Sequence, residues 1–440
     1  MELTFDALNL NTPLRNALQD LGFTAPTPIQ AKAFPAIMSG RDVIGIAQTG
    51  TGKTFAYLLP ILRQMTFSNQ KDPRVLIVVP TRELVLQVVG EINKLTAYMN
   101  VRVEGVYGGT NINTQKNVLV NGIDVLVGTP GRLMDLGLSR IILLRQVKQL
   151  IIDEVDEMLS LGFRGQLTTL FDMMSPKRQN ILFSATMTEE VDSLIETFFN
   201  GPMTVEVTRA GTPLAKIHQT GYRVPNFNTK LNLLQHLLSS DEGMKKVLIF
   251  CASKKIADRT YRFLDEAFPD EFDVIHGNKS QNFRLNAVAA FEKGRLRGLI
   301  ATDLLARGLD VTDVTHVINL NLPESPETYI HRIGRTGRAD TEGAALSLIS
   351  DQEVDFLHPI EYLMEKELPL LPTPESIEIS NTLTDEELPV VMMKNYLPKA
   401  DIKQSQGAFH EKKDKNKKVN LTGAEKRKRA MAARKRKKKK

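Results

Sequence analysis

The stretch that decides the fold is residues 43–54, which read Val-Ile-Gly-Ile-Ala-Gln-Thr-Gly-Thr-Gly-Lys-Thr. An apolar strand leads directly into a turn rich in Gly and Thr, and a helix-forming run follows. Gly50 and Gly52 let backbone N–H groups turn inward around a chain of phosphates. Lys53 would then reach the outer phosphates, and the Thr54 hydroxyl would bind Mg²⁺. The pattern predicts a nucleotide-binding α/β domain, although Ala47 stands where the common pattern has glycine.

Outward from this stretch, short runs rich in Val, Ile and Leu alternate with helical stretches. Such runs suit strands buried on both faces of a parallel sheet, and their alternation with helices favours a doubly wound α/β fold. The first series of predicted strands lies at 43–47, 75–79, 102–106, 123–127, 149–152 and 180–184. After a loop at 209–213 the same rhythm gives strands at 219–224, 246–250, 272–275, 298–301, 315–319 and 344–348, then a helix at 351–366.

We therefore expect two tandem α/β domains, at 1–207 and 213–355, joined by a linker at 208–212. A C-terminal extension at 356–400 follows, of which 368–399 carries no clear structural pattern. A basic tail at 401–440 is expected to be disordered.

The charge of the chain is divided between an acidic body and a basic tail. The 440 residues carry a net charge of +6, but residues 411–440 alone hold 16 Lys and Arg against three acidic residues. The other 410 residues therefore carry 41 basic and 48 acidic side chains. Such a tail indicates a polyanionic partner, with a solubilising tail or a nuclear address as alternatives. Its Thr422-x-x-Glu425 spacing also allows a helix that forms on that partner.

Composition excludes several other classes of protein. Apolar residues make up 42% of the chain, which is enough for well-buried cores. No apolar run reaches 18 residues and the N-terminus lacks a basic-then-apolar signal, so we expect a cytoplasmic protein with no membrane partner. Cys251 is the only cysteine, and as the end of an apolar strand it is expected to be a buried, inert thiol.

A cluster of acids follows the strand predicted at 149–152. Asp153, Glu154 and Asp156 stand at the carboxyl end of a parallel strand, where α/β sheets bind ligands. A Mg²⁺–nucleotide complex needs one carboxylate at the metal and one acceptor that orients the attacking water. Asp153 and Glu154 are the candidates for these roles, in that order.

With these residues in place, the chain resembles the DEAD-box family of ATP-dependent RNA helicases over about residues 3–350. The matching motifs occur in the family's order. They are Phe5, Gly22-Phe23, 26–30 (Pro-Thr-Pro-Ile-Gln), the phosphate loop, 80–84 (Pro-Thr-Arg-Glu-Leu), Gly108-Gly109, 129–132 (Thr-Pro-Gly-Arg), the acidic box, 184–186 (Ser-Ala-Thr), His276-Gly277, Gln281, Arg284, 301–303 (Ala-Thr-Asp), 306–310 (Ala-Arg-Gly-Leu-Asp) and 331–338 (His-Arg-Ile-Gly-Arg-Thr-Gly-Arg).

The resemblance implies two RecA-like domains that hydrolyse ATP with Mg²⁺ when RNA closes them, and that locally separate short duplexes or remodel RNA–protein complexes. RNA binding would be largely independent of sequence. The residues that the resemblance assigns are as follows: ATP contacts at Phe23, Gln30, Thr49, Gly50, Thr51, Gly52, Lys53, Thr54 and Asp310; metal contacts at Thr54 and Asp153; catalysis by Lys53, Asp153 and Glu154 with arginine fingers Arg335 and Arg338; coupling through Asp156, Ser184, Thr186 and His331; RNA contacts at Thr81, Arg82, Gly109, Thr129, Arg132 and Thr302.

The chain departs from the family in three places. Val155 replaces the alanine of the acidic box, Asn278-Lys279 replaces an acidic residue, and Leu304-Leu305 is bulkier than usual. Val155 raises the alternative of an ATP-gated RNA clamp with slowed hydrolysis, which the intact Glu154, Arg335 and Arg338 argue against. A DNA translocase shares the two-domain plan, but the segment around Gln30 and the arginine motif at 331–338 disfavour it.

Overall fold

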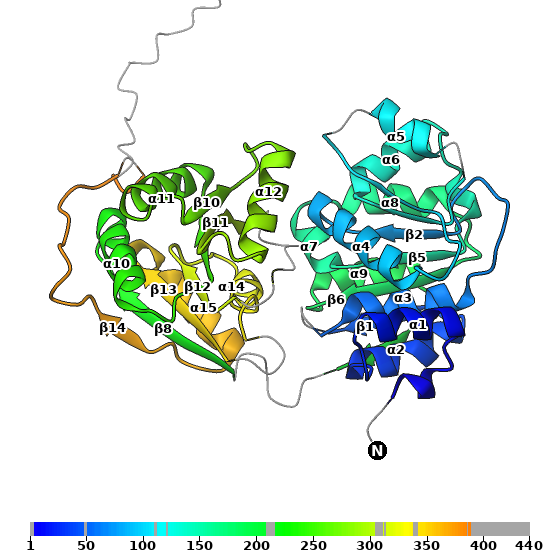
Figure 1. The fold of residues 1–440 in the computed structure, drawn as a ribbon, viewed down its shortest axis with the longest axis horizontal. Helices are drawn as coiled ribbons and strands as arrows, with labels where there is room; N and C mark the ends of the chain where they lie inside the picture. Colours follow the sequence, from blue (N-terminus) through cyan, green and yellow to red (C-terminus); the bar gives the residue numbers. More distant parts are fainter. Residues whose placement is uncertain are drawn as a thin grey trace, which may run out of the picture. The chain divides into compact units, whose positions relative to one another are not determined.

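The chain folds around two parallel β-sheets of seven strands each in this computed structural model. The structure describes residues 4–47, 51–109, 112–119, 122–207, 216–303, 311, 314–337, 342–384 and 386–388. We call the part built on the first sheet the N-terminal lobe and the part built on the second the C-terminal lobe (Figure 1).

The sheet of the N-terminal lobe has the strand order β3-β4-β2-β5-β6-β1-β7. Its strands are β1 (Val43–Ile46), β2 (Val75–Val78), β3 (Val103–Val106), β4 (Val125–Gly128), β5 (Gln149–Ile152), β6 (Gln179–Ser184) and β7 (Met203–Glu206). Its helices are η1 (Phe5–Leu8), α1 (Thr12–Asp20), α2 (Pro28–Met38), α3 (Lys53–Gln64), α4 (Arg82–Leu95), α5 (Ile112–Leu119), α6 (Pro130–Leu138), η2 (Leu144–Gln146), α7 (Val155–Ser160), α8 (Arg164–Met173) and α9 (Glu189–Phe198).

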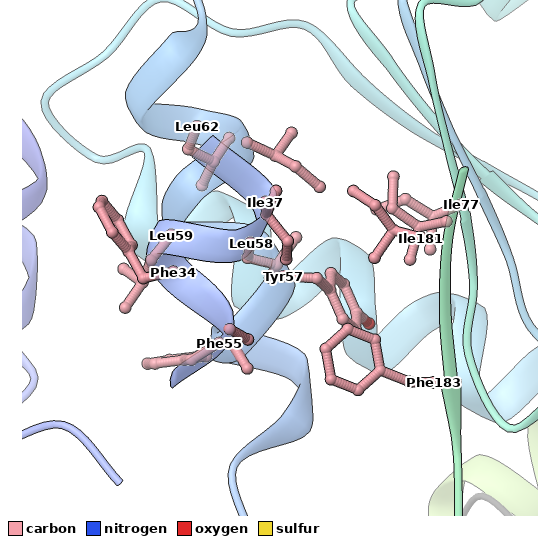
Figure 2. Close-up of a cluster of buried hydrophobic side chains, with 14 of the residues drawn as sticks. Phe34, Ile37, Phe55, Tyr57, Leu58, Leu59, Leu62, Ile77, Ile181 and Phe183 are labelled. Carbon is pink, nitrogen blue, oxygen red and sulfur yellow. The ribbon is translucent and has the colours of Figure 1, made fainter. Parts of the chain in front are cut away.

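Two hydrophobic cores cover the two faces of this sheet. Alternate residues of β2 point to opposite sides, so Val75 and Ile77 join one core while Leu76 and Val78 join the other. Figure 2 shows the first core, where Tyr57 of α3 lies beside Phe183 of β6 and Phe34 of α2 lies on the opposite side of the two helices. Gly45 of β1 is required there, because a side chain at that position would overlap the ring of Phe183.

The sheet of the C-terminal lobe has the order β10-β11-β9-β12-β13-β8-β14. Its strands are β8 (Ile217–Arg223), β9 (Val247–Cys251), β10 (Phe272–Ile275), β11 (Gly298–Thr302), β12 (His316–Asn319), β13 (Gly343–Ile349) and β14 (Leu370–Pro372). Its helices are α10 (Phe227–Ser240), α11 (Lys254–Ala267), α12 (Gln281–Glu292), α14 (Pro326–Ile333), η4 (Asp351–Glu353) and α15 (Val354–Met364).

Part of the expected C-terminal extension belongs to the second lobe. β14 pairs in parallel with β8, and the chain then crosses α10. Three asparagine side chains of α10 and its N-cap fasten it there by donating to backbone carbonyls: Asn226 to Ser380 (2.6 Å), Asn228 to Thr382 (2.7 Å) and Asn232 to Glu378 (2.8 Å). We call residues 370–387 the C-terminal strap.

The predicted fold class is confirmed, because both sheets are parallel and carry helices on their two faces. All twelve predicted strands are present, whereas β7 and β14 were not predicted. Within the described residues, no helix has both the length and the hydropathy needed to cross a bilayer. The expected linker at 208–212 and the expected tail at 401–440 lie outside the described residues, so the disorder and the helix predicted for the tail stay predictions.

Candidate functional site

The phosphate loop ends at Gly52, directly before the first residue of α3. Gly52 has a φ of 88°, a left-handed conformation that favours glycine. The Gln30 amide donates from Nε2 to the Gly52 carbonyl at 3.2 Å and accepts at Oε1 from the Thr27 N–H at 3.0 Å. The predicted adenine-reading segment is therefore hydrogen-bonded to the phosphate loop. Thr49 and Gly50 lie outside the described residues.

Phe23 is the aromatic side chain expected to stack on the base. Its ring is 48% exposed and packs edge-to-face on Phe55, with ring centroids 5.2 Å apart. An exposed ring supported from beneath by α3 is suited to stacking.

Lys53 places a buried ammonium group beside the acidic box. The residue is only 7% exposed, and its Nζ has no hydrogen-bond partner in the described part of the chain. A buried charge without hydrogen bonds is costly, so this arrangement is suited to an anionic ligand.

Asp153 follows β5 and is oriented by two donors. Its Oδ2 accepts from the Tyr57 hydroxyl and its Oδ1 from the Glu154 N–H, each at 3.0 Å. Burial raises the pKa of Asp153, while the nearby charge of Lys53 opposes that rise. Sequence reasoning missed Tyr57; only its place one helical turn after Lys53 could have indicated it.

Glu154 adopts a strained conformation at the N-cap of α7. Its φ of 54° is unusual for a residue other than glycine, and strain of this kind is common at functional sites. Its Oε2 is buried and has no hydrogen-bond partner among the described residues. Burial raises the pKa of the Glu154 carboxyl to about 7, and the charges of Lys53 and Arg335 counteract part of that effect.

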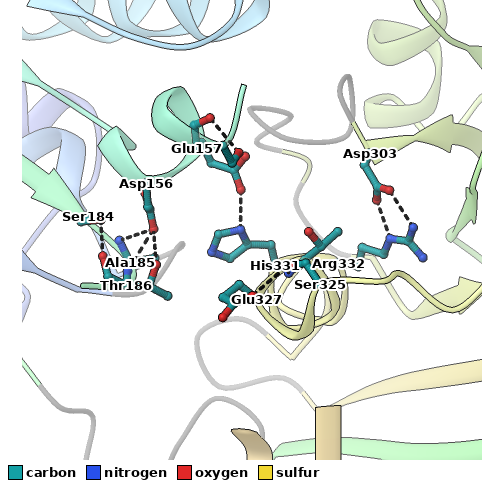
Figure 3. Close-up of polar contacts among 12 residues, drawn as sticks. Asp156, Glu157, Ser184, Ala185, Thr186, Asp303, Ser325, Glu327, His331 and Arg332 are labelled. Carbon is teal, nitrogen blue, oxygen red and sulfur yellow. Dashed lines mark hydrogen bonds and ion pairs between the residues drawn. The ribbon is translucent and has the colours of Figure 1, made fainter. Parts of the chain in front are cut away.

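Asp156 joins the acidic box to the segment after β6. Its Oδ2 accepts from three donors: the N–H of Ala185 (3.1 Å), the N–H of Thr186 (3.0 Å) and the Thr186 hydroxyl (3.0 Å). The Ser184 hydroxyl donates to the Thr186 carbonyl at 2.6 Å (Figure 3). The structure thus brings together three of the four residues predicted to couple ATP to RNA.

The fourth, His331, lies on α14 and meets an acid that was not predicted. His331 Nδ1 and Glu157 Oε1 are 2.6 Å apart (Figure 3). Arg335 is 5% exposed, donates from Nε to the His331 carbonyl at 3.3 Å, and its charge acts on Glu154. The other predicted arginine finger, Arg338, and the predicted ribose contact, Asp310, lie outside the described residues.

Arg332 fixes Asp303, the residue that follows β11. It forms a bidentate ion pair with Asp303, at 2.5 Å from Nε and 2.8 Å from Nη2, and donates from Nη1 to Asn319 at 3.1 Å. Thr302, a predicted RNA contact, is the residue before Asp303 and is nearly buried. Thr302 belongs to the second sheet, whereas the other predicted RNA contacts belong to the N-terminal lobe.

The remaining predicted RNA contacts follow neighbouring strands of the first sheet. Thr81 caps α4 by accepting the Leu84 N–H at 3.3 Å, and Thr129 is the N-cap of α6. Both therefore stand at helix N-termini, which favour phosphate groups. Gly109 lies against Arg82, so closely that a side chain there would overlap the guanidinium. Arg132 donates from Nη1 to Gln115 at 2.6 Å, a partner that sequence reasoning missed.

The side chains of the site offer few ligands to a metal ion. The described residues contain no cluster of three His, Cys, Asp or Glu side chains that could hold a metal ion. A carboxylate and a hydroxyl near a phosphate site suit Mg²⁺, which keeps several waters and takes few protein ligands. Asp153 and Thr54 fit that pattern.

Comparison with known proteins identifies the family. Residues 27–194 match the model of the DEAD/DEAH box helicase, and residues 229–340 match the helicase conserved C-terminal domain. The DEAD-box ATP-dependent RNA helicase CshA of Geobacillus kaustophilus is 37% identical over 88% of this chain and 82% of its own. The RNA helicase CrhR of Synechocystis is 38% identical over 86% and 76%.

Solved structures give the same result. The fold is similar to Mss116 bound to single-stranded RNA and UDP-BeF, with a TM-score of 0.78 and 28% identity over 86% of this chain and 82% of that one. It is also similar to Dbp5 of S. cerevisiae bound to RNA and ADP BeF3, with a TM-score of 0.76 and 29% identity over 84% and 96%. With both family models matched in order and the relatives covered over most of their length, the chain belongs to the DEAD-box family and is an ATP-dependent RNA helicase.

Proposed function

We propose that this helicase hydrolyses ATP with Mg²⁺ only when RNA brings its two lobes together, and that it then separates short duplexes locally or remodels RNA–protein complexes. The observation that carries this proposal is the division of the charged groups between lobes. Lys53, Asp153 and Glu154 belong to the N-terminal lobe, whereas Arg335 belongs to the C-terminal lobe and its charge acts on Glu154.

Each group of the N-terminal lobe has a distinct task in this scheme. Phe23 and Gln30 hold the adenine, the loop from Thr49 to Thr54 holds the phosphates, and Lys53 neutralises the outer ones. Glu154 orients the attacking water with Oε2, which has no hydrogen-bond partner in the described part of the chain. Bound Mg²⁺ would neutralise charge on the phosphate oxygens. Thr54 and Asp153 are the residues that would hold it.

The C-terminal lobe completes the site through its arginines. Arg335 and Arg338 would stabilise charge that develops on the transferred phosphoryl group, an effect worth ~10³–10⁵ in rate. Asp310 would contact the ribose. His331 near Glu157, and Glu83 3.1 Å from Arg284, are pairs that could form only when the lobes approach. Asp156, Ser184 and Thr186 would transmit closure to the bound RNA.

RNA would be held by its backbone. Thr81, Arg82, Gly109, Thr129 and Arg132 in the first lobe and Thr302 in the second would contact phosphate and sugar groups. Contacts of this kind position a strand without reading its bases, so little sequence preference is expected. We also propose a cytoplasmic location, which cell fractionation would check.

The decisive experiment is steady-state ATP hydrolysis with and without single-stranded RNA, using the full chain and a Glu154→Gln variant. Strong stimulation by RNA that Glu154→Gln abolishes would support closure-gated catalysis. Glu104→Gln is a matched control, because burial also raises the pKa of Glu104 but it lies in β3. RNA and ATP binding without RNA-dependent hydrolysis would instead favour a clamp, and equal stimulation by DNA of the same sequence would favour a translocase.

We further propose that the basic tail tethers the enzyme to structured RNA or ribosomal precursors. Residues 411–440 carry a local net charge of +13, which comes from 16 basic and three acidic residues. Binding by such a segment releases counterions and is therefore sensitive to salt. Removing residues 411–440 should weaken RNA binding and flatten its salt dependence, while hydrolysis at saturating RNA persists. Unchanged RNA affinity after the truncation would exclude the tether.

A further inference from the structure

Tyr57 is a fully buried tyrosine whose hydroxyl faces the candidate metal site. It lies on α3, and its ring packs against Phe183 with centroids 5.5 Å apart (Figure 2). The rest of its surroundings is apolar, since it belongs to the hydrophobic core that α2 and α3 form against the sheet. Packing alone would be satisfied by phenylalanine, so the hydroxyl needs a separate explanation.

The hydroxyl lies near two residues that come from different parts of the sequence. It donates to Asp153 Oδ2 at 3.0 Å, and the nearby Thr54 side chain opposes the rise that burial causes in the pKa of Tyr57. Thr54 and Tyr57 are three residues apart on α3 and so share one face of the helix, whereas Asp153 follows β5. The phenolic oxygen thereby connects α3 to the residue that follows β5, on the helix face that also carries Thr54.

This arrangement suits a site that must bind a cation. A tyrosine hydroxyl that donates to Asp153 can still accept another hydrogen bond. Accepting one from Thr54 would leave the lone pairs of the threonine oxygen available to a cation. When it donates to Oδ2 of Asp153, and the Glu154 N–H donates to Oδ1, the carboxylate is held in one orientation with further lone pairs available.

We propose that Tyr57 is a positioning residue that holds Thr54 and Asp153 at the spacing in which they bind Mg²⁺ together with the nucleotide. This inference rests on the roles proposed above for Thr54 and Asp153. Groups that hydrogen-bond a metal ligand typically contribute ~10–100-fold to metal affinity. Because the Glu154 N–H would still orient Asp153 without the phenol, we expect an effect near the lower end of that range.

The test is equilibrium binding of a fluorescent N-methylanthraniloyl ADP to the full chain, which involves no turnover. The dissociation constant is measured in EDTA and in saturating Mg²⁺, and the ratio of the two reports how strongly the cation and the nucleotide are coupled. Tyr57→Phe should reduce this ratio about tenfold. If the wild-type ratio is itself below about ten, Tyr57→Phe should reduce it to one. The dissociation constant in EDTA should stay within about twofold, because the loop and base contacts are unchanged.

Two further variants make the outcomes distinguishable. Tyr329→Phe removes another buried hydroxyl, one that donates to Gln219 at 3.0 Å in the other lobe, and should leave the ratio unchanged. Asp153→Asn should reduce the ratio strongly. A normal ratio in Tyr57→Phe with a reduced ratio in Asp153→Asn would overturn the positioning role alone. A normal ratio in Asp153→Asn would overturn the proposed metal site and this inference with it. Equal weakening of Tyr57→Phe in EDTA and Mg²⁺ would show a purely structural role and also overturn the inference.

Discussion

The hydrogen bond from the Thr186 hydroxyl to Asp156 gives a sharp test of coupling between ATP hydrolysis and strand separation. Thr186→Val removes this 3.0 Å bond while it keeps the shape of the side chain. The two backbone N–H groups of Ala185 and Thr186 would still bind Asp156, so the segment after β6 keeps its path. We expect the fold and the ATP site to be unaffected.

The magnitude follows from the chemistry of the bond. A buried hydrogen bond to a charged group contributes ~1.5–3 kcal/mol, and Thr186 is only half-buried, so we take about 1 kcal/mol. That free energy corresponds to about a fivefold effect. Duplex separation per ATP hydrolysed should therefore fall about fivefold, while RNA-stimulated hydrolysis changes less than about twofold. Both rates are measured on one short RNA duplex at saturating ATP.

Two comparisons separate this role from a general loss of stability. Thr188→Val makes the same chemical change two residues later, where the hydroxyl only caps α9 by accepting from Val191 at 3.4 Å, and should leave the coupling intact. In an Asp156→Ala background, Thr186→Val should have no further effect, because its acceptor is gone. Additive losses in the double variant, or a parallel fall in hydrolysis and unwinding, would refute the coupling role.

Three further predictions follow from the same lobe. Lys53→Ala should abolish measurable ATP binding and hydrolysis, because it removes a buried ammonium group that has no hydrogen-bond partner among the described residues. A titration with fluorescent ATP checks this, and retained affinity would contradict it. Gly52→Ala should weaken ATP binding about tenfold or more for two reasons. The new Cβ would lie 2.6 Å from Gln30 Nε2, and an alanine held in the left-handed conformation of Gly52 costs ~1–2 kcal/mol. Gly40→Ala, with a similar φ of 79° and open space around it, should lose stability but bind ATP normally. Burial opposes ionisation of Asp124, but hydrogen bonds from Arg102 and other donors outweigh burial and lower the pKa of Asp124 to about 2. The ionised Asp124 should therefore add ~1–2 kcal/mol to the free energy of unfolding above about pH 4, and this contribution should be lost as the pH falls from 4 to 2. Asp124→Asn should remove this acid-dependent step from unfolding curves.

The strands that could be predicted are those that lie inside the sheets. β2 and β5 are buried on both faces, so hydrophobicity alone marks them. β7 and β14 stand at sheet edges: β7 alternates apolar and polar residues over four positions, and β14 is only three residues long and ends in proline. The C-terminal strap could not be predicted for a related reason. It is held by the asparagines of α10 through backbone carbonyls, which any sequence offers equally.

The site shows a similar limit. Motif spacing located Lys53, Asp153 and Asp156, because each belongs to a pattern with a fixed order along the chain. Tyr57 and Glu157 belong to no such pattern, and their contacts depend on which strand or helix lies beside them in space. A buried tyrosine in an apolar helix face is indistinguishable in the sequence from a core residue, since its ring does occupy the core.

A strained backbone coincides with two buried charged groups that lack hydrogen-bond partners among the described residues, and this coincidence is itself an argument for function. Five residues other than glycine have positive φ, and four of them (Asn9, Arg140, Asp270 and Glu365) are exposed at turns and helix ends in the described part of the chain. The fifth, Glu154, is partly buried beside Lys53, whose ammonium also lacks a hydrogen-bond partner there. Features that weaken the folded state persist where the surrounding structure imposes them, and the cores on both faces of the sheet provide that rigidity. The hydrogen-bonding capacity that Lys53 and Glu154 leave open among the described residues therefore suits ATP together with the water that attacks it, since ATP brings the negative charge and the water needs an acceptor.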